Sequence, residues 1–349
     1  MTKVICKCAA ILALLLAVAL PCCAQADRVY QYFRVGSATD AHASPRAGYA
    51  LMGGGTDLDE AFQWLCSRAN GGDLLVLRAT GTDAYNEYIQ KLCHLNSVAT
   101  LVIPNREAAN DPFVKKKIRG ASAIFISGGD QANYINFWTK TPVQTAINDA
   151  IARGIPIGGT SAGLAVLGEY VYSAQGDKPN DPDLDSKMAL SDPFHPRVTL
   201  VRGFLDIPVL KGVITDTHFA KRDRIGRLLV FLARLNEPDG IPIPPTAPTF
   251  RGIGIEERAA VLLEPDGSAS VAGKGNAYFI DARSASGVLV GKFGAMALHK
   301  PITFGPFAVR KVAPEHTFNV KTWTGDTTKY SLSIKDGVID STQAGGAIY

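Results

Sequence analysis

Residues 155–163 read Ile-Pro-Ile-Gly-Gly-Thr-Ser-Ala-Gly, so that a short apolar run passes into a G-x-S-x-G motif centred on Ser161. A helical pattern follows directly. A serine between a strand and a helix, with small neighbours, is typical of a nucleophile elbow, because the tight turn has no room for larger side chains. The helix N-terminus favours a developing alkoxide, and its N–H groups can stabilise an oxyanion. The motif predicts a nucleophilic Ser161; a Gly-rich tight turn without chemistry is the alternative.

Strand-like apolar runs alternate with helical patterns on both sides of this motif. The expected strands lie at 48–52, 73–79, 98–104, 121–127, 155–159 and 212–217. Repeated strand–helix units predict a parallel sheet with helices on both faces. From residue 252 onward, short strands with Gly and Asp turns predict antiparallel additions at the sheet edge or a small β appendage. We therefore predict an α/β fold: a doubly wound parallel sheet sandwiched by helices, with antiparallel β additions toward the C-terminus.

Three connections stand out from this alternation. Residues 175–196 and the stretch 236–249, which contains five Pro, read as long surface loops; such loops inside a compact domain are usually functional or disordered. Gly53-Gly54-Gly55 follows the first of these strands, and the next helix is expected to be capped by Asp57 and Glu60. Because no G-x-G-x-x-G or Walker motif follows, this triple glycine reads as a strand–helix turn rather than a nucleotide site.

The first 24 residues are predicted to be a signal peptide. Lys3 and Lys7 form a positive region, residues 9–20 are continuously apolar, and Cys22-Cys23-Ala24 offers small residues for cleavage near Ala24. The apolar run is shorter than the about 20 residues that a spanning helix needs. Acylation at Cys22 or Cys23, as in a lipoprotein, is the rival interpretation. The mature protein is therefore expected to be secreted or periplasmic, with no membrane span.

Composition excludes several classes of protein. The chain has 349 residues, of which 46% are hydrophobic and 19% charged, which fits a globular protein and excludes disorder, collagen-like repeats and a coiled coil. The formal net charge is +4, and loss of Lys3 and Lys7 with the leader lowers it to +2. This balance indicates neither nucleic acid nor a membrane surface as partner.

Of the cysteines, only Cys66 and Cys93 remain beyond the leader, and they form either one disulfide or two buried thiols. No Cys/His cluster predicts a zinc site.

A nucleophilic serine needs a base, and His218 is the histidine best placed for that role. Of the six histidines, it alone follows a predicted parallel strand, at the edge where open α/β sheets place their sites. A helix is expected over 219–235, with Arg222 one turn beyond His218. Arg222, Arg224 and Arg227 form either a solvated helix face or a site for a substrate with carboxylate or guanidinium groups.

Four stretches resemble the cyanophycinases, a family of serine exopeptidases related to peptidase E, with a class I glutamine-amidotransferase-like fold. They are Ser127-Gly128-Gly129-Asp130-Gln131, the motif Gly159 to Gly163, the segment Asp216 to Arg227 and, more weakly, Gly254-Ile255-Glu256-Glu257. The resemblance runs from the first strand to about residue 265. One departure is Thr217, which stands where the family usually has Gln; its shorter side chain lacks the amide donor and acceptor that Gln would offer to a substrate.

The resemblance implies a Ser-His-Glu triad. Ser161 would be the nucleophile, His218 its general base and Glu257 the carboxylate that orients the imidazole. Glu256 and Asp216 stay open as rivals for the third position, because the Pro-rich stretch lengthens the path to Glu257. The implied substrate-binding residues are Gln131, Asp216, Thr217, Arg222, Arg224 and Arg227, and the implied oxyanion or turn residues are Gly128, Gly129 and Ala162.

The resemblance also implies a substrate. The family hydrolyses cyanophycin, a polymer with an aspartate backbone and Arg attached through isopeptide bonds, to β-Asp-Arg dipeptides. The three arginines suit its carboxylates, while Asp216 and the acidic stretch 175–192 suit its guanidinium groups.

The resemblance implies no metal or cofactor, and it suggests a homodimer. We expect a peptidase domain at 25–285 and a β-rich extension at 286–349. The alternatives are a peptidase E-like aspartyl dipeptidase and a non-catalytic binding protein on the same scaffold.

Overall fold

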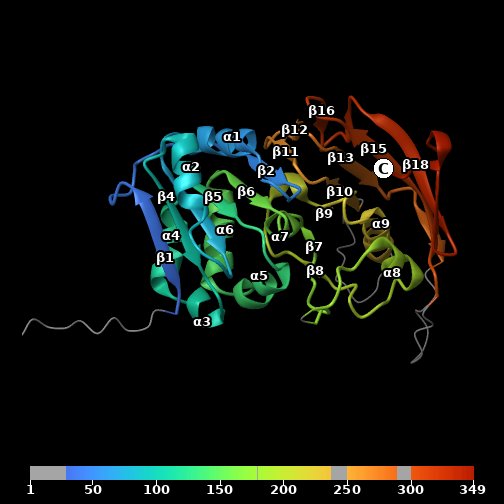
Figure 1. Ribbon diagram of the computed structural model, residues 1–349, viewed down its shortest axis with the longest axis horizontal. Helices are drawn as coiled ribbons and strands as arrows, with labels where there is room; N and C mark the ends of the chain where they lie inside the picture. Colours follow the sequence, from blue (N-terminus) through green and yellow to red (C-terminus); the bar gives the residue numbers. More distant parts are fainter. Residues whose placement is uncertain (1–28, 179, 237–249, 289–299) are drawn as a thin grey trace, which may run out of the picture.

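The computed structural model describes residues 29–178, 180–236, 250–288 and 300–349 (Figure 1). The predicted signal peptide, its cleavage site and most of the Pro-rich stretch lie outside these residues. Within them, no helix is both long and apolar enough to cross a bilayer.

The first sheet is parallel in its middle and antiparallel at its ends. In spatial order it contains β1 (Gln31–Gly36), β4 (Ser97–Val102), β3 (Asp73–Arg78), β5 (Ala123–Ile126), β6 (Ile157–Thr160), β2 (Tyr49–Met52), β11 (Ala259–Leu263), β12 (Ser268–Gly273), β16 (Thr317–Asn319) and β17 (Thr324–Gly325). The run from β4 to β2 is parallel. Strand β1 and the strands from β11 onward pair antiparallel.

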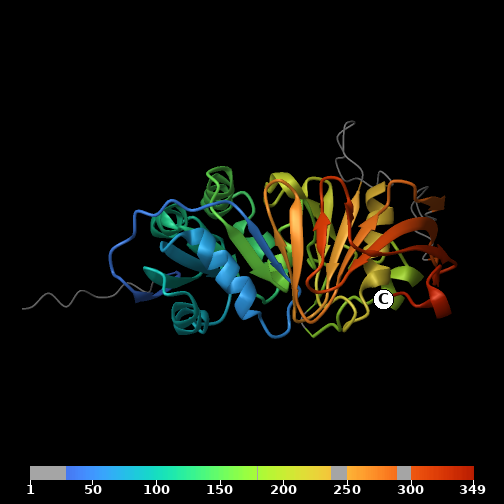
Figure 2. The same cartoon turned by 90° about the horizontal axis from the view of Figure 1, so that it is seen from above.

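Helices cover both faces of the parallel strands (Figure 2). They are α1 (Asp59–Ala69), α2 (Tyr85–Cys93), α3 (Arg106–Ala109), α4 (Pro112–Gly120), α5 (Gln131–Trp138), α6 (Pro142–Ala152) and α7 (Ala162–Ala165). Successive side chains of β3 belong to different hydrophobic cores. Leu74 and Val76 pack with α1 and α2, whereas Leu75 and Leu77 pack with α4 to α6. Because successive side chains point to opposite faces, a strand buried on both sides must be apolar throughout. This arrangement confirms the predicted fold class.

The second sheet adjoins the first at the antiparallel end. Its order is β19 (Val338–Ser341), β18 (Thr328–Lys335), β15 (Thr303–Val312), β13 (Ala277–Asp281), β10 (Arg251–Ile255), β9 (Val213–Asp216), β7 (Tyr170–Tyr172) and β8 (Leu200–Arg202), with β14 (Ser286–Val288) beside β15. Helices α8 (Ser186–Ser191) and α9 (Ile225–Asn236) pack together in this half. Strands of the predicted extension pair with both sheets, because β15 joins β13 and β16 joins β12. The boundary at residue 285 stays a prediction.

Three local expectations were wrong. Helix α9 begins at Ile225 rather than near residue 219, because His218 and Asp223 have positive φ angles of 48° and 45° that interrupt a helix. Helix α1 has no side-chain cap, since Asp57 accepts from the Tyr85 hydroxyl at 2.6 Å instead. The stretch 175–196, read as one loop, contains α8.

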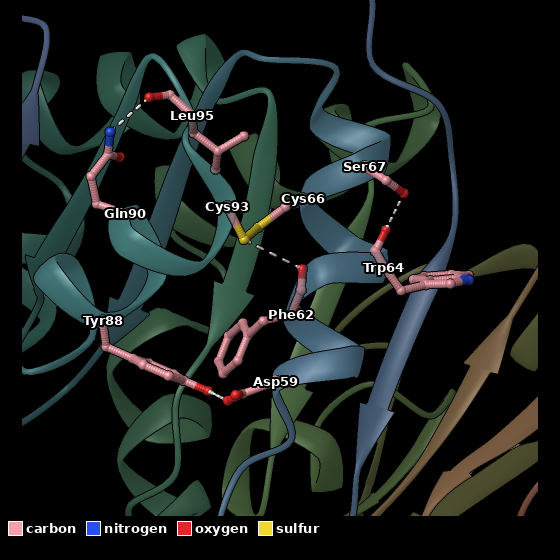
Figure 3. The surroundings of a disulfide bond; sticks show 9 residues. All are labelled: Asp59, Phe62, Trp64, Cys66, Ser67, Tyr88, Gln90, Cys93 and Leu95. Atoms are coloured by element: carbon pink, nitrogen blue, oxygen red, sulfur yellow. Dashed lines mark hydrogen bonds between the residues drawn. A yellow bond between two sulfur atoms is a disulfide. The ribbon is translucent and has the colours of Figure 1, made fainter.

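A disulfide joins Cys66 of α1 to Cys93 at the end of α2, with 6.0 Å between the Cα atoms (Figure 3). It cross-links the two helices that cover one face of the parallel strands, beside the buried ring of Phe62. The two cysteines thus form one disulfide and are not two separate buried thiols.

Candidate active site

Ser161 lies in a strained turn between β6 and α7. Its φ and ψ angles are 51° and −119°, a conformation that side-chain-bearing residues rarely adopt and that functional sites often retain. The Ser161 N–H donates to Met52 O at 3.2 Å, which ties the turn to the end of β2. A Cβ atom on Gly163 would lie 2.0 Å from Ile126 O of β5, so the last glycine of the motif is required by close backbone packing. The turn thus has the features expected of a nucleophile elbow.

His218 follows β9, and its ring reaches the serine from a different sheet. The Ser161 Oγ and His218 Nε2 atoms are 2.7 Å apart. The His218 backbone also has a positive φ, and its N–H donates to Gly53 O at 2.8 Å. In Figure 1, β6, α7, β9 and β10 meet in the middle of the molecule, where the two sheets adjoin.

Glu257 follows β10 and is the carboxylate that reaches the other nitrogen of His218, with Oε1 2.7 Å from Nδ1. The two rivals are engaged elsewhere. Glu256 accepts from the Tyr278 hydroxyl at 2.7 Å and from the Asn276 N–H at 2.8 Å. Asp216 accepts from Arg227 Nε at 2.8 Å. Because a carboxylate only accepts, Nδ1 carries the imidazole proton and Nε2 is left to accept from Ser161.

The surroundings of His218 favour the neutral imidazole. Burial lowers its pKa below the ordinary value, the hydrogen bond to Glu257 acts in the opposite direction, and the charges of Arg222 and Arg224 lower it further. The side chain is 6% exposed. At neutral pH the ring is therefore an uncharged acceptor within hydrogen-bond distance of the serine hydroxyl.

The triple glycine after β2 lies against this pair, a role that the sequence interpretation missed. A Cβ atom on Gly54 would be 2.5 Å from His218 Cε1, and one on Gly55 would be 3.1 Å from Glu257 Cβ. Both glycines have positive φ angles. The turn leaves the space that the imidazole and the carboxylate fill. A run of three glycines at a strand end was the available signal.

The glycine turn after β5 borders the serine. A Cβ atom on Gly128 would lie 3.4 Å from Ser161 Cβ, and Gly129 lines the cleft in front of the serine. Ala162 is the first residue of α7, so its N–H has no acceptor within the helix. The expected oxyanion residues therefore surround Ser161, and their role stays a prediction.

A cleft of about 530 Å³ opens in front of Ser161. Of the expected substrate-binding residues, Gln131, Thr217, Arg222, Arg224 and Arg227 line it, together with acidic residues that the sequence assigned only as a group: Asp177, Asp181 and Asp183. Positive and negative side chains thus face the same cavity. The residues that line the cleft come mainly from α5 and from the connection that follows β7.

The three arginines differ in their surroundings. Arg227 is 3% exposed, pairs with the equally buried Asp216, and lies 5.0 Å from the centre of the Tyr172 ring. Asp216 is thereby held behind the wall of the cleft and does not line it, contrary to its expected contact with substrate. The buried ion pair therefore stabilises the segment 216–227 and does not present a free charge to a substrate.

Arg222 and Arg224 share one carboxylate oxygen. Asp183 Oδ2 accepts from Arg222 Nη1 at 2.9 Å and from Arg224 Nη2 at 2.8 Å. Burial lowers the pKa of Arg224 to about 10, so its guanidinium still carries a charge at neutral pH. Asp183 lies in the loop that separates β7 from α8, and nothing in its local sequence predicts this bridge.

Thr217 and Gln131 make different contacts. Thr217 accepts from Arg224 Nη1 through both its hydroxyl and its carbonyl oxygen, at 3.0 Å each, so it holds the guanidinium in place. Gln131 begins α5, after the N-cap Asp130, and its Nε2 is 3.5 Å from Tyr172 O. Among the described residues no group of three or more His, Cys, Asp or Glu side chains is arranged to hold a metal ion.

Sequence comparisons with known proteins point in the same direction. Residues 50–191 match the model of peptidase family S51. A cyanophycinase of Synechococcus elongatus is 26% identical over 263 residues, which are 72% of this chain and 73% of that protein. A cyanophycinase of Nostoc sp. is 30% identical over 187 residues, 53% of each chain. A peptidase structure from an acI-B1 actinobacterium covers 85% of this chain and 97% of its own, with a TM-score of 0.44 and 16% identity. The sequence matches confirm the predicted resemblance and support a serine-type peptidase.

Proposed function

We propose that this serine-type peptidase, related to the cyanophycinases, is an exported exopeptidase that hydrolyses cyanophycin to β-Asp-Arg dipeptides through Ser161, His218 and Glu257. The observation that carries the proposal is the continuous hydrogen-bonded chain from Ser161 Oγ through both ring nitrogens of His218 to Glu257 Oε1, with 2.7 Å at each link. Ser161 lies at a cleft that is lined by both positively and negatively charged side chains.

In the first step Ser161 Oγ attacks the carbonyl carbon of the scissile amide while its proton moves to His218 Nε2. Glu257 accepts from Nδ1 and stabilises the imidazolium that forms, as the carboxylate of a triad does. The lowered pKa of His218 keeps the ring neutral and ready to accept at neutral pH. The oxyanion that develops would lie toward the N–H groups of Gly129 and Ala162.

In the second step the C–N bond breaks, and His218 gives its proton to the leaving amine. This leaves an acyl group on Ser161. A water molecule then attacks the ester carbonyl while His218 takes its proton, the C–O bond to Ser161 breaks, and the proton returns to Oγ. The products are the released amine, the free serine and a carboxylic acid that gives up its remaining proton at neutral pH, so water is the only co-reactant.

The charges of the cleft support the proposed substrate. A β-Asp-Arg unit carries both carboxylate and guanidinium groups, so it needs cations and anions in one pocket. Arg222 and Arg224 supply the former and Asp183 with its acidic neighbours the latter. A bidentate contact between an arginine and a carboxylate adds geometric specificity as well as energy.

Two features support export. The signal peptide expected at residues 1–24 is one. The other is the Cys66–Cys93 disulfide, since such bonds persist in oxidising compartments and are rare in the cytosol. N-terminal sequencing of protein purified from outside the cytosol should find residue 25 or a close neighbour first. Retention of Met1, or an acylated Cys22 or Cys23, would contradict this assignment.

The test of the activity uses the chain from residue 25 and purified cyanophycin. Mass spectrometry of the soluble products should detect β-Asp-Arg with the wild type and none with Ser161→Ala. An α-aspartyl dipeptide serves as the comparison substrate. Hydrolysis of the dipeptide without any release from the polymer would favour the peptidase E-like alternative instead.

A further inference from the structure

A cluster of aromatic side chains contacts the residues next to His218 and Glu257. It includes Tyr349, which is far away from both in the sequence. The ring centroid of Phe219 lies 5.2 Å from that of Tyr278 and 5.9 Å from that of Tyr349, and the two tyrosine rings are 5.9 Å apart. We call these three residues the aromatic brace. Such ring pairs contribute beyond simple burial when they are tilted or edge-on, as these are.

Phe219 attaches the brace to the imidazole. It follows His218 directly, is fully buried, and its N–H donates to Ile255 O of β10 at 3.2 Å. Its ring lies on Gly254, where a Cβ atom would come within 2.5 Å of Phe219 Cε2. The glycine in this position therefore lets the ring approach the strand that leads to Glu257.

Tyr278 attaches the brace to the second loop of the triad. Its hydroxyl donates to Glu256 Oε1 at 2.7 Å, and Glu256 also accepts from the Asn276 N–H. Because Glu256 immediately precedes Glu257, this contact restrains the loop that presents the carboxylate to His218 Nδ1.

Tyr349 holds the segment 218–225 at both of its ends. Its hydroxyl accepts from the N–H of Ile225, the first residue of α9, at 3.0 Å, and donates to Asp223 Oδ1 at 3.0 Å. The Ile225 N–H has no acceptor within the helix, so the phenol oxygen acts as its cap. The ring meanwhile contacts Phe219. Two residues of this segment, His218 and Asp223, have positive φ angles, and such a backbone persists only where its surroundings restrain it.

We propose that Tyr349 is a positioning residue for His218, acting through Phe219 and Ile225. This inference rests on the proposed serine mechanism and goes beyond it, because it gives the β-rich C-terminal part of the chain a role in the reaction. Tyr349 touches none of the reacting atoms. It restrains the strained segment whose first residue must keep Nε2 within 2.7 Å of Ser161 Oγ.

The test measures the reactivity of Ser161 with phenylmethylsulfonyl fluoride, a small uncharged probe that needs none of the arginines. Oγ forms a bond to sulfur, fluoride leaves, and the hydroxyl proton passes to His218, so the rate reports the Ser161–His218 pair. We expect Tyr349→Ala to lower the second-order rate about 10- to 100-fold, the cost of a displacement on the order of 1 Å. Tyr349→Phe keeps the ring and loses the cap, and should cost about 2- to 10-fold, the range for one hydrogen bond.

The pH dependence of that rate separates positioning from stability. A loosened segment admits water to His218, and since burial is what lowers its pKa, the midpoint of the rate should move to higher pH. Tyr88→Phe is the matched control. The Tyr88 hydroxyl also donates to a carboxylate, that of Asp59, and its ring packs edge-on against Phe62 (Figure 3), without touching segment 218–225.

The proposal predicts a slower rate and a higher midpoint in folded Tyr349 variants, with Tyr88→Phe like the wild type. It is overturned if folded Tyr349→Phe and Tyr349→Ala label like the wild type, or if Tyr88→Phe slows as much. Should Tyr349→Ala not fold, Tyr349→Phe decides alone. A folded wild type that is not labelled at all contradicts the serine mechanism itself, and the inference falls with it.

Discussion

The turn that carries Ser161 and the segment that carries His218 both border the cleft, yet they are held by different forces. The serine turn is fixed by backbone contacts of small residues with the neighbouring strands β2 and β5. The segment 216–227 is fixed by side chains: the Asp216–Arg227 ion pair, the bridge from Asp183 and the hydroxyl of Tyr349. The small residues of the serine motif permit its sharp turn and its close backbone packing, whereas the segment needs particular side chains, of which Asp183 and Tyr349 lie far away in the sequence.

The largest effect should follow from the serine turn. Ser161→Ala removes one oxygen and leaves the packed glycines in place. We expect kcat/KM on the polymer to fall by at least about 10³-fold, the range seen when a triad member is removed. The midpoint of thermal unfolding should stay close to that of the wild type. Retained turnover would show that the backbone-held turn is structural only.

The second effect tests the segment held by side chains. Asp216→Asn leaves the buried Arg227 without its charged partner, which should cost about 3–5 kcal/mol of the free energy of unfolding. Asp206→Asn is the matched control, because both side chains of the Lys211–Asp206 pair are exposed and such a pair should contribute only about 0–1 kcal/mol. Urea titrations of both variants measure this difference. Equal losses would mean that the two ion pairs support the fold alike.

The third effect concerns substrate rather than fold. Arg222→Ala should lower kcat/KM on cyanophycin by roughly tenfold to a few hundredfold, since a charge-assisted contact contributes about 1.5–3 kcal/mol. Arg222→Lys keeps the charge but loses the planar fork, so it should recover only part of the activity. Unchanged kinetics for Arg222→Ala would make this arginine a solvated partner of Asp183 and favour the broader aspartyl-peptidase interpretation.

The smallest effect arises within the segment 216–227, from the charge of Arg222 on His218. The free base of His218 is the active form, so kcat/KM should fall as the pH drops through a pKa that burial holds below the ordinary value for histidine. Arg222 lowers that pKa further, and Arg222→Ala should therefore move the acid limb to higher pH by less than about one unit. A limb that moves to lower pH, or not at all, would show that Arg222 does not act on the imidazole. The measurement is a pH profile of kcat/KM for both proteins.

Thr217 shows that a residue assigned to the substrate pocket can also have a structural contact. The sequence placed it in the substrate pocket, where the family usually has Gln. In the structure it lines the cleft and also holds Arg224 through its hydroxyl and carbonyl oxygens. Asp216 was likewise assigned to substrate, but its pairing with Arg227 turns it inward. Charge and position along the chain do not reveal which of several nearby partners an ionic side chain takes.

The sequence by itself determined the features that depend on near neighbours. The alternating strand and helix patterns specify the parallel sheet between two layers of helices, and the glycines around Ser161 specify the sharp turn, because both follow from backbone geometry and from the period of apolar residues. The positions of Ser161 and His218 at strand ends follow from the same periodicity.

Only the tertiary structure decided which distant side chains meet. It brings Glu257, and neither Glu256 nor Asp216, to His218 Nδ1; it joins Cys66 to Cys93; and it lays Tyr349 on the segment after His218. Each of these contacts spans 27 or more residues of sequence. The physical reason is that hydrogen bonds and ion pairs act over a few ångströms, so their partners are chosen by how sheets and loops pack, which no local pattern records.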